Sequence, residues 1–477
     1  MKIFNRYKYV ATIVLCIVYA SCKLPVPLQV PMLKPAPAAY NTSTDTTNSA
    51  DLNWKEFFND PNLITLIDTA INNNIELLMT LQDINIAQNR VHFREGALKP
   101  MVSAGGAIGL EKVGTYTSQG AGDASADITE GHKVPEHLPD FVGGLKASWE
   151  IDIWGKLKTA RGAALTKYLA SFEGRNFVRT NLIAEIANSY YELLALDNQL
   201  DILRENIKLQ QNQLEIVKIQ KQAAVVTELA VKQFEAQIFN TQSTEYEVLQ
   251  GIVETENKIN FLLSRYPQPI LRDKATLMAQ LPSTIKAGIP SQMLRNRPDV
   301  RRAELELMAT KMEVKVAQLE FYPSLALSSR IGLNAFSPAY LFKLPESILY
   351  TLASDMVGPI INKNAITAEF RTANAVQIQA MYDYQKALLN GYFEVSNELT
   401  HIGNLEKRYN FKAQEVDVQT KSISIANDLF KSARANYLEV LTAQREALAS
   451  KLELIEVKQR QFTAVTNVYR ALGGGWK

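Results

Sequence analysis

The chain has 477 residues, of which 47% are hydrophobic and 21% are charged, so it is long enough to bury a large core. Its formal net charge of +2 implies no basic face, and we expect no nucleic-acid partner. The two cysteines, Cys16 and Cys22, both lie near the N-terminus. Disulfides within the rest of the chain are therefore excluded, and its stability must come from packing, strand pairing or assembly.

Residues 1–21 are predicted to be an export signal. A positively charged start precedes the apolar run Val10–Val18, which is too short to span a bilayer. The segment Tyr19–Cys22 resembles a bacterial lipobox, in which cleavage leaves the cysteine as an acylated first residue. An ordinary signal peptide with an incidental cysteine is the alternative. Because Cys22 would be the only cysteine of the mature chain, we expect lipidation there, followed by an extended Pro/Ser/Thr-rich tether over residues 22–50 without a core of its own.

Two long stretches, residues 140–266 and 360–477, contain no proline and can form long helices. We predict helices from Thr159 to about Val226 and from Ala365 to Ala433, each roughly 100 Å long at 1.5 Å per residue and each followed by a returning helix. Apolar residues recur at every seventh position, which favours packing against neighbouring helices. These residues are Ile186, Leu193, Leu200, Ile207 and Leu214, and then Leu388, Val395, Ile402, Tyr409, Val416, Ile423 and Phe430.

Strands are predicted in pairs before each long helix. The first pair is Lys99–Leu110 and Phe141–Trp154, separated by the polar stretch Gly114–Pro139. The second pair is Tyr322–Leu333 and Leu349–Ile361. Strands of about ten residues cross an outer membrane when they are tilted.

The order helix, strand, loop, strand, long helix, returning helix therefore occurs twice. It predicts an internal repeat, with halves at residues 51–288 and 289–477. Four strands cannot close a membrane barrel, and open edges are not tolerated in lipid, so the chain must oligomerise. Three copies would give twelve strands, which is an acceptable barrel number, although composition alone does not select three over two or four.

Several segments resemble TolC-type outer-membrane efflux proteins, and in particular their lipoprotein branch. The most specific stretch is Ile289–Arg301, and further matches are Trp54–Leu63, Ala147–Lys158, Tyr437–Gln444 and Tyr469–Trp476. The resemblance covers essentially all of the chain beyond the tether. It implies an α+β membrane protein, namely a trimeric 12-stranded transmembrane β-barrel continued by a long periplasmic α-helical barrel.

The same resemblance implies a function without chemistry. The homotrimer would be the outer-membrane channel of a tripartite efflux system, lipid-anchored and extending into the periplasm. Its partners would be a periplasmic adaptor (membrane fusion) protein, an inner-membrane pump and outer-membrane lipid. Small molecules such as drugs and toxic compounds would pass through a passive conduit to the exterior. The same channel serving metal-cation or polypeptide export stays open as an alternative.

A periplasmic gate near the second hairpin tip is also implied by the resemblance, because the family places acidic rings there. Glu439 occupies the first acidic position, whereas the second is Thr442, which is not acidic. Phe430 takes the place of an aromatic residue that helps to hold the mouth closed, and Arg434 lies one residue from the basic position at Ala435. We expect at most one ring of three carboxylates. The alternative is that Glu439 is an ordinary solvated tip residue.

The motif Arg297-Pro298-Asp299 has a structural interpretation, because proline suits a first helical turn and an acidic residue suits the helix N-terminus. Nothing in the sequence indicates an enzyme, a metal site or a cofactor other than lipid on Cys22: there is no phosphate-binding loop or catalytic triad pattern. His132 and His137 fall in the first predicted loop, where solvated histidines are expected. A periplasmic coiled-coil scaffold lipoprotein and a surface-anchored hydrolase are the competing classes, opposed by the strand pairs and by the missing catalytic residues.

Overall fold

The computed structural model describes residues 26–28, 37, 39–40, 46–278, 286–361, 363–432 and 434–477. The predicted export signal and Cys22 lie outside these residues, and the prediction of lipidation stays a prediction. The chain divides into two compact units. Unit 1 takes in the described parts of Met1–Pro31, Asn85–Leu169 and Leu305–Met381, and unit 2 those of Met32–Ile84, Ala170–Glu304 and Tyr382–Lys477.

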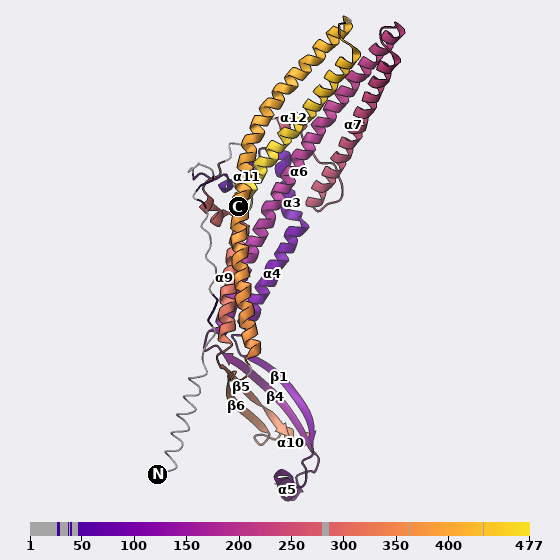
Figure 1. Ribbon diagram of the computed structural model, residues 1–477. Coiled ribbons are helices and arrows are strands. Elements are labelled where there is room, and N and C mark those ends of the chain that lie inside the picture. Colours follow the sequence, from indigo (N-terminus) through magenta and orange to yellow (C-terminus); the bar gives the residue numbers. More distant parts are fainter. Residues whose placement is uncertain are drawn as a thin grey trace. The chain divides into compact units, whose positions relative to one another are not determined.

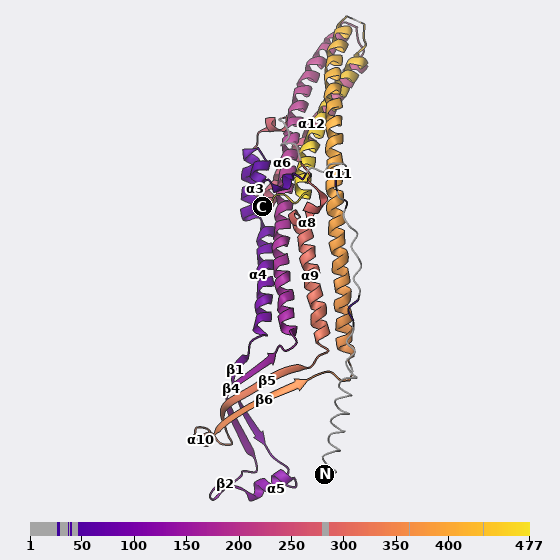
Figure 2. The ribbon, with the colours of Figure 1, turned by 90° about the vertical axis from the view of Figure 1, so that its left-hand side faces the viewer.

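Unit 1 contains a four-stranded antiparallel sheet, shown in Figure 1 and Figure 2. Its order is β1 (Met101–Glu111), β4 (Leu138–Ile151), β5 (Ser324–Ala335) and β6 (Ile348–Val357). Every neighbouring pair is antiparallel. Because β1 and β6 stand first and last in this order, they are the two edge strands of the sheet. The four predicted strand segments are confirmed to within a few residues.

The β4–β5 pairing depends on two glycines that face each other. Gly144 lies opposite Gly332 in the register. A Cβ on either glycine would lie 2.3 Å from a backbone oxygen of the neighbouring strand. Only glycine permits this close approach of two backbones.

The polar stretch between β1 and β4 is more structured than the sequence analysis predicts. It contains α5 (Ser118–Ser125), β2 (Asp127–Thr129) and β3 (His132–Lys133). Thr117 caps α5, because its side chain accepts a hydrogen bond of 3.1 Å from the backbone N–H of Gly120. The loop between β5 and β6 contains only the short helix α10 (Pro338–Leu341).

The passage from β4 into the first long helix is fixed by local contacts. Gly155 adopts a positive φ of 76°, which glycine accepts without strain. The carboxylate of Asp152 then accepts hydrogen bonds from the backbone N–H groups of Leu157 and Lys158, at 2.9 and 2.8 Å. An acidic side chain that satisfies the free N–H groups is a typical way to start a helix.

Two very long helices dominate the chain, α6 (Lys156–Gln222) with 67 residues and α11 (Asn364–Lys431) with 68 residues. Each is followed by a returning helix of 35 residues, α7 (Glu228–Leu262) and α12 (Tyr437–Ala471). The prediction of two long and two returning helices is confirmed.

The remaining helices are shorter. They are η1 (Ser49–Asp51), α2 (Trp54–Phe57), α3 (Pro61–Asn73), α4 (Ile75–Gly96), η2 (Lys274–Met278), η3 (Pro290–Gln292), α8 (Met293–Asn296) and α9 (Pro298–Leu319). None of the described helices is both long enough and apolar enough to span a membrane.

Within unit 2, the helices lie in the order α7, α6, α12, α11, as Figure 1 shows. Arg204 of α6 pairs with Glu245 of α7 at 2.8 Å, and Asn188 of α6 donates to Asn467 of α12 at 3.1 Å. Lys412 of α11 pairs with a glutamate of α12 at 2.7 Å. Helices α7 and α11 are therefore the two edges of this helical layer.

The seven-residue pattern agrees with this order. All five apolar residues of the α6 series, from Ile186 to Leu214, are buried, because α6 has a neighbour on both sides. In the α11 series only Val395 and Phe430 are buried, and the others are half-buried. An edge helix has a neighbouring helix on one side only, so its apolar series is less covered than that of α6.

Part of the predicted tether packs on unit 2. Tyr40 is buried and stacks on Tyr392, with ring centroids 5.5 Å apart. Further along, Asn48 forms a β-bridge with Ala287. The described end of this segment is thus attached to the helical layer rather than free.

Candidate gate at the hairpin tips

The start of α12 is built around Glu439. The side chain of Asn436 accepts a hydrogen bond of 3.1 Å from the backbone N–H of Glu439, and the Glu439 carboxylate accepts one of 3.4 Å from the N–H of Asn436. This reciprocal arrangement is a capping box. Glu439 is otherwise exposed, and no lysine or arginine pairs with it within the described residues. Its carboxylate therefore has a structural partner but an uncompensated charge.

Phe430 lies in an apolar group that we call the tip cluster. Its nine buried members come from all four long and returning helices: Leu214, Val217, Ala230, Val231, Phe234, Ile238, Phe430, Val440 and Leu441. Phe430 is only 7% exposed. It joins the end of α11 to the other hairpin, which suits a residue that holds the tip together.

Arg434 lies in the turn between α11 and α12. Its backbone N–H donates to the carbonyl of Leu429 at 2.8 Å, which closes the end of α11. The side chain is exposed, and no acidic residue pairs with its guanidinium within the described residues. The turn therefore presents one cation and one anion, Arg434 and Glu439, to solvent.

The tip of the first hairpin is different. Glu228, at the start of α7, forms ion pairs with Lys221 and Lys232, and the hydrogen bond with Lys221 lowers the pKa of this carboxyl. Ala230, which is the third residue of α7 as Glu439 is the third residue of α12, is fully buried in the tip cluster. The first hairpin thus carries a neutralised acid, and the second carries the uncompensated one.

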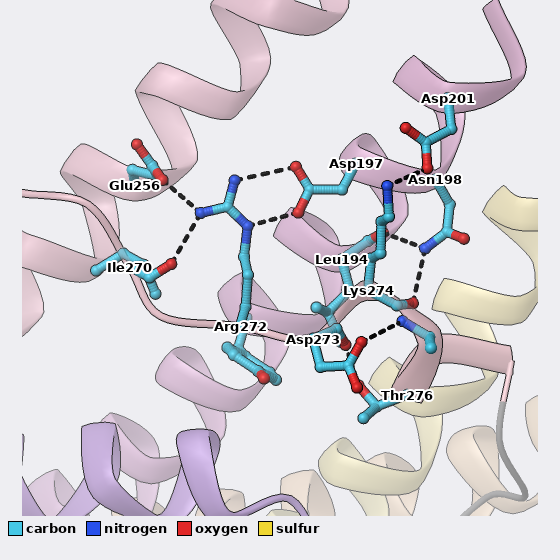
Figure 3. A network of polar contacts seen from close by, with 12 residues as sticks. Leu194, Asp197, Asn198, Asp201, Glu256, Ile270, Arg272, Asp273, Lys274 and Thr276 are labelled. Carbon is cyan, nitrogen blue, oxygen red and sulfur yellow. Dashed lines mark hydrogen bonds and ion pairs between the residues drawn. The ribbon is translucent and has the colours of Figure 1, made fainter. Parts of the chain in front are cut away.

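A second polar group, shown in Figure 3, attaches the segment after α7 to the helices. Arg272 makes two hydrogen bonds to Asp197, at 2.5 and 3.0 Å, one of 2.5 Å to Glu256 and one of 3.0 Å to the carbonyl of Ile270. These contacts, the one to Asp197 foremost, raise the pKa of Arg272. The sequence analysis did not find this clamp, because its members are far apart in the chain. Four hydrogen bonds direct the guanidinium at structural acceptors, so the clamp holds this segment against the helices.

The motif at 297–299 has the structural role that the sequence predicts, with an addition. Pro298 is the first residue of α9, and Asp299 lies in its first turn. The Arg297 guanidinium also binds both carboxylate oxygens of Asp299, at 3.0 and 2.7 Å, Glu394 at 2.8 Å and the carbonyl of Ala471 at 2.7 Å. Burial lowers the pKa of Arg297, but the Asp299 and Glu394 contacts outweigh it and hold the pKa above its usual value.

The histidines of the first loop do not gather with other ligands. His132 lies in β3 and is exposed. In the part of the chain that the structure describes, no group of three or more histidine, cysteine, aspartate or glutamate side chains is placed to hold a metal ion.

The sequence profile described as outer membrane efflux protein matches residues 66–265 and 289–474. The chain belongs to the outer membrane efflux protein family. The resemblance found in the sequence is thereby confirmed, and so are the outer-membrane location and the role as a channel component of an efflux system. Its family and fold are those of channel proteins.

Similar proteins cover nearly the whole chain. Pyoverdine export outer membrane protein OpmQ of Pseudomonas putida is 28% identical over 96% of this chain and 95% of that protein. Probable outer membrane lipoprotein SilC of Salmonella typhimurium is 26% identical over 95% of this chain and 93% of that protein. The crystal structure of a membrane protein from Pseudomonas aeruginosa shares the fold with a TM-score of 0.85, at 22% identity, over 95% of this chain and 100% of that one.

Proposed function

We propose that three copies of this efflux protein close a 12-stranded transmembrane β-barrel, continued by a periplasmic α-helical barrel. The observation that carries the proposal is the four-stranded sheet with two unpaired edges, β1 and β6. An even number of alternating strands makes β6 of one copy antiparallel to β1 of the next, so a ring of copies continues the same pairing. Closure removes the edges, which lipid does not tolerate.

The conduit would export small molecules passively, and it would not be an enzyme. A relative named for pyoverdine export supports a small-molecule substrate. A periplasmic adaptor and an inner-membrane pump would supply the substrate and the energy. The same channel serving metal cations or polypeptides is the alternative. A deletion strain tested against drugs, dyes and metal salts separates these classes by the compounds to which it becomes sensitive.

The periplasmic mouth would be gated at the second hairpin. Three copies of Glu439 would form one acidic ring, supported by its exposure and its lack of a cationic partner among the described residues. Like charges brought together disfavour each other, so the ring would favour cations over anions. Phe430, through the tip cluster, and Arg434, in the turn, would hold the mouth closed.

The N-terminus would carry the lipid anchor. Cys22 would be acylated after removal of residues 1–21, with residues 22–50 as the tether, and a relative named as a lipoprotein supports this. The helix–strand–strand–helix halves, residues 51–288 and 289–477, would be two copies of one repeat. Their element orders correspond, with a strand pair, a long helix and a returning helix in each.

Mass measurement of the purified full-length protein in detergent tests the assembly. We expect the mass of three copies, and a stable monomer would refute the proposed barrel. Recordings in a planar bilayer then test the conduit. A trimer that conducts no ions under any condition would leave the assembly intact and refute the channel.

A further inference from the structure

Two arginines of α6, Arg175 and Arg179, differ from most arginines of the helical layer. Arginines such as Arg272, Arg297 and Arg301 each bind a carboxylate at 3.0 Å or less. Arg175 and Arg179 are half-buried, and neither forms an ion pair within the described residues. They are four residues apart, so they lie on one face of the helix, and α6 has no aspartate or glutamate three or four positions from either of them. We call these two residues the α6 arginine pair.

Arg179 is the more strongly desolvated member of the pair. Its Nε atom is buried and has no hydrogen-bond partner. Burial, and after it the positive charge of Arg175, lower the pKa of Arg179. A buried donor without an acceptor and a second cation nearby both disfavour the folded chain. In native proteins, a bound ion, a bound water or a functional role explains an unsatisfied buried group of this kind.

The other groups whose charge acts on Arg179 already have partners. The carboxylate of Asp68 on α3 raises the pKa of Arg179 less than burial lowers it, and this carboxylate pairs with Lys55 at 2.8 Å. The hydroxyl of Tyr469 on α12 donates a hydrogen bond of 2.8 Å to the carbonyl of Leu52. Neither group hydrogen-bonds to the guanidinium, so the charge of the α6 arginine pair is not neutralised by its surroundings.

We propose that the α6 arginine pair binds a small soluble phosphate, either inorganic phosphate or a phosphate ester. A guanidinium holds several N–H donors in one plane and binds a phosphate through two of them. A phosphate monoester carries about −1.5 to −2 charges at pH 7, so it matches two cations better than a single carboxylate does. The site consists of residues of one copy, and it therefore does not depend on the proposed trimer.

The surroundings of Arg179 favour such a ligand over bulk water. Charges attract each other more strongly where water is displaced, and Arg179 is partly withdrawn from water. An arginine is also more weakly hydrated than a lysine, so it loses less when it binds an anion. A phosphate held by both arginines would relieve the repulsion between them and stabilise this part of α6.

Equilibrium dialysis of the full-length protein in detergent against radiolabelled inorganic phosphate measures the binding directly. We expect one phosphate per chain. Arg179→Met keeps an apolar stem but removes the donors, and it should weaken binding at least about tenfold, the value of a hydrogen bond to a charged group. Arg179→Lys should weaken binding less, because it keeps the charge. Arg445→Met is the matched control, because Arg445 is exposed on α12 and also forms no ion pair in the described part of the chain.

Thermal unfolding at fixed ionic strength separates a ligand site from a structural arginine. In chloride buffer, Arg179→Met should unfold no earlier than the wild type, because it removes a desolvated cation that has no partner. In phosphate buffer, the wild type should gain more stability than the variant, because a ligand stabilises the state that binds it. Phosphate also stabilises proteins in general, so the gain of Arg445→Met provides the reference.

The outcomes that overturn the proposal are distinct. Equal phosphate binding by the wild type and Arg179→Met excludes the site, and earlier unfolding of Arg179→Met in chloride makes Arg179 structural. If Arg179→Met does not fold, Arg175→Met takes its place with the same expectations. Binding of phosphatidylglycerol in mixed micelles without binding of inorganic phosphate would make the ligand a lipid headgroup and overturn the proposal. A monomeric wild type that still binds phosphate would refute the trimer and leave the site.

Discussion

Replacing Arg297 tests whether the most family-specific motif is structural. Its guanidinium is 4% exposed and makes four contacts of 2.7–3.0 Å, three to the carboxylates of Asp299 and Glu394 and one to the carbonyl of Ala471. Removing one member of a buried ion pair costs about 3–5 kcal/mol, because the remaining charges stay without a partner. Glu394 is more than a third exposed, so water compensates it in part, and we expect Arg297→Ala to cost about 3 kcal/mol.

Arg297→Lys is the informative companion. It keeps the charge, but a single ammonium cannot bind both oxygens of Asp299 and also reach Glu394 and the carbonyl. We expect a smaller loss of about 2 kcal/mol, the value of hydrogen bonds to charged groups. Gly391→Ala provides an independent check of the same contacts. A Cβ at residue 391 would lie 3.0 Å from the Nε atom of Arg297 and would push the guanidinium away from its partners.

Thermal unfolding in detergent and hydrogen exchange at the C-terminal end of α12 measure these losses. The order of stability should be wild type, Arg297→Lys, Arg297→Ala. If Arg297→Ala unfolds like the wild type but fails to complement efflux, the structural interpretation is refuted and the motif acts directly in transport.

Four further outcomes are expected. Glu439→Gln should weaken cation preference in a planar bilayer, whereas Asn436→Ala, which breaks the cap but keeps the charge, should not; equal effects would assign the change to the cap. Phe430→Ala should raise the resting conductance, because losing a buried ring costs the tip about 3–5 kcal/mol; unchanged conductance would exclude Phe430 from closure. Arg272→Ala should speed hydrogen exchange in the segment after α7 more than Arg272→Lys does, and equal protection would contradict the clamp. Cys22→Ser should abolish labelling by a fatty-acid analogue, and undiminished labelling would disprove acylation.

The long helices could be predicted because their signals are local and repeated. The two stretches lack proline and have apolar residues at every seventh position. These two signals predicted the ends of α6 and α11 to within a few residues. The short α5 escaped prediction, because its sequence, Ser118–Ser125, is rich in glycine and serine and has no apolar periodicity. Its helix depends on the cap by Thr117.

The polar contacts between distant residues were harder to predict from the sequence. The clamp of Arg272 on Asp197 joins residues 75 positions apart, and no local pattern announces such a pair. The capping box of Asn436 and Glu439 is different, because an asparagine followed three positions later by glutamate is readable as a helix start. The sequence analysis weighed Glu439 as a gate or a solvated residue, and the structure adds its role in starting α12.

That capping role bears on how tight an acidic ring can be. A good N-cap stabilises a helix by about 1 kcal/mol, and the helix dipole favours a carboxylate there by about 0.3–1 kcal/mol. Two unit charges about 6 Å apart repel by roughly 3 kcal/mol at an effective dielectric constant near 20. Each carboxylate of a ring of three has two such neighbours, so the repulsion at that separation exceeds what the cap supplies. In the proposed ring of Glu439, a cation held among the carboxylates would offset this repulsion, and without such compensation the repulsion would keep the mouth wider.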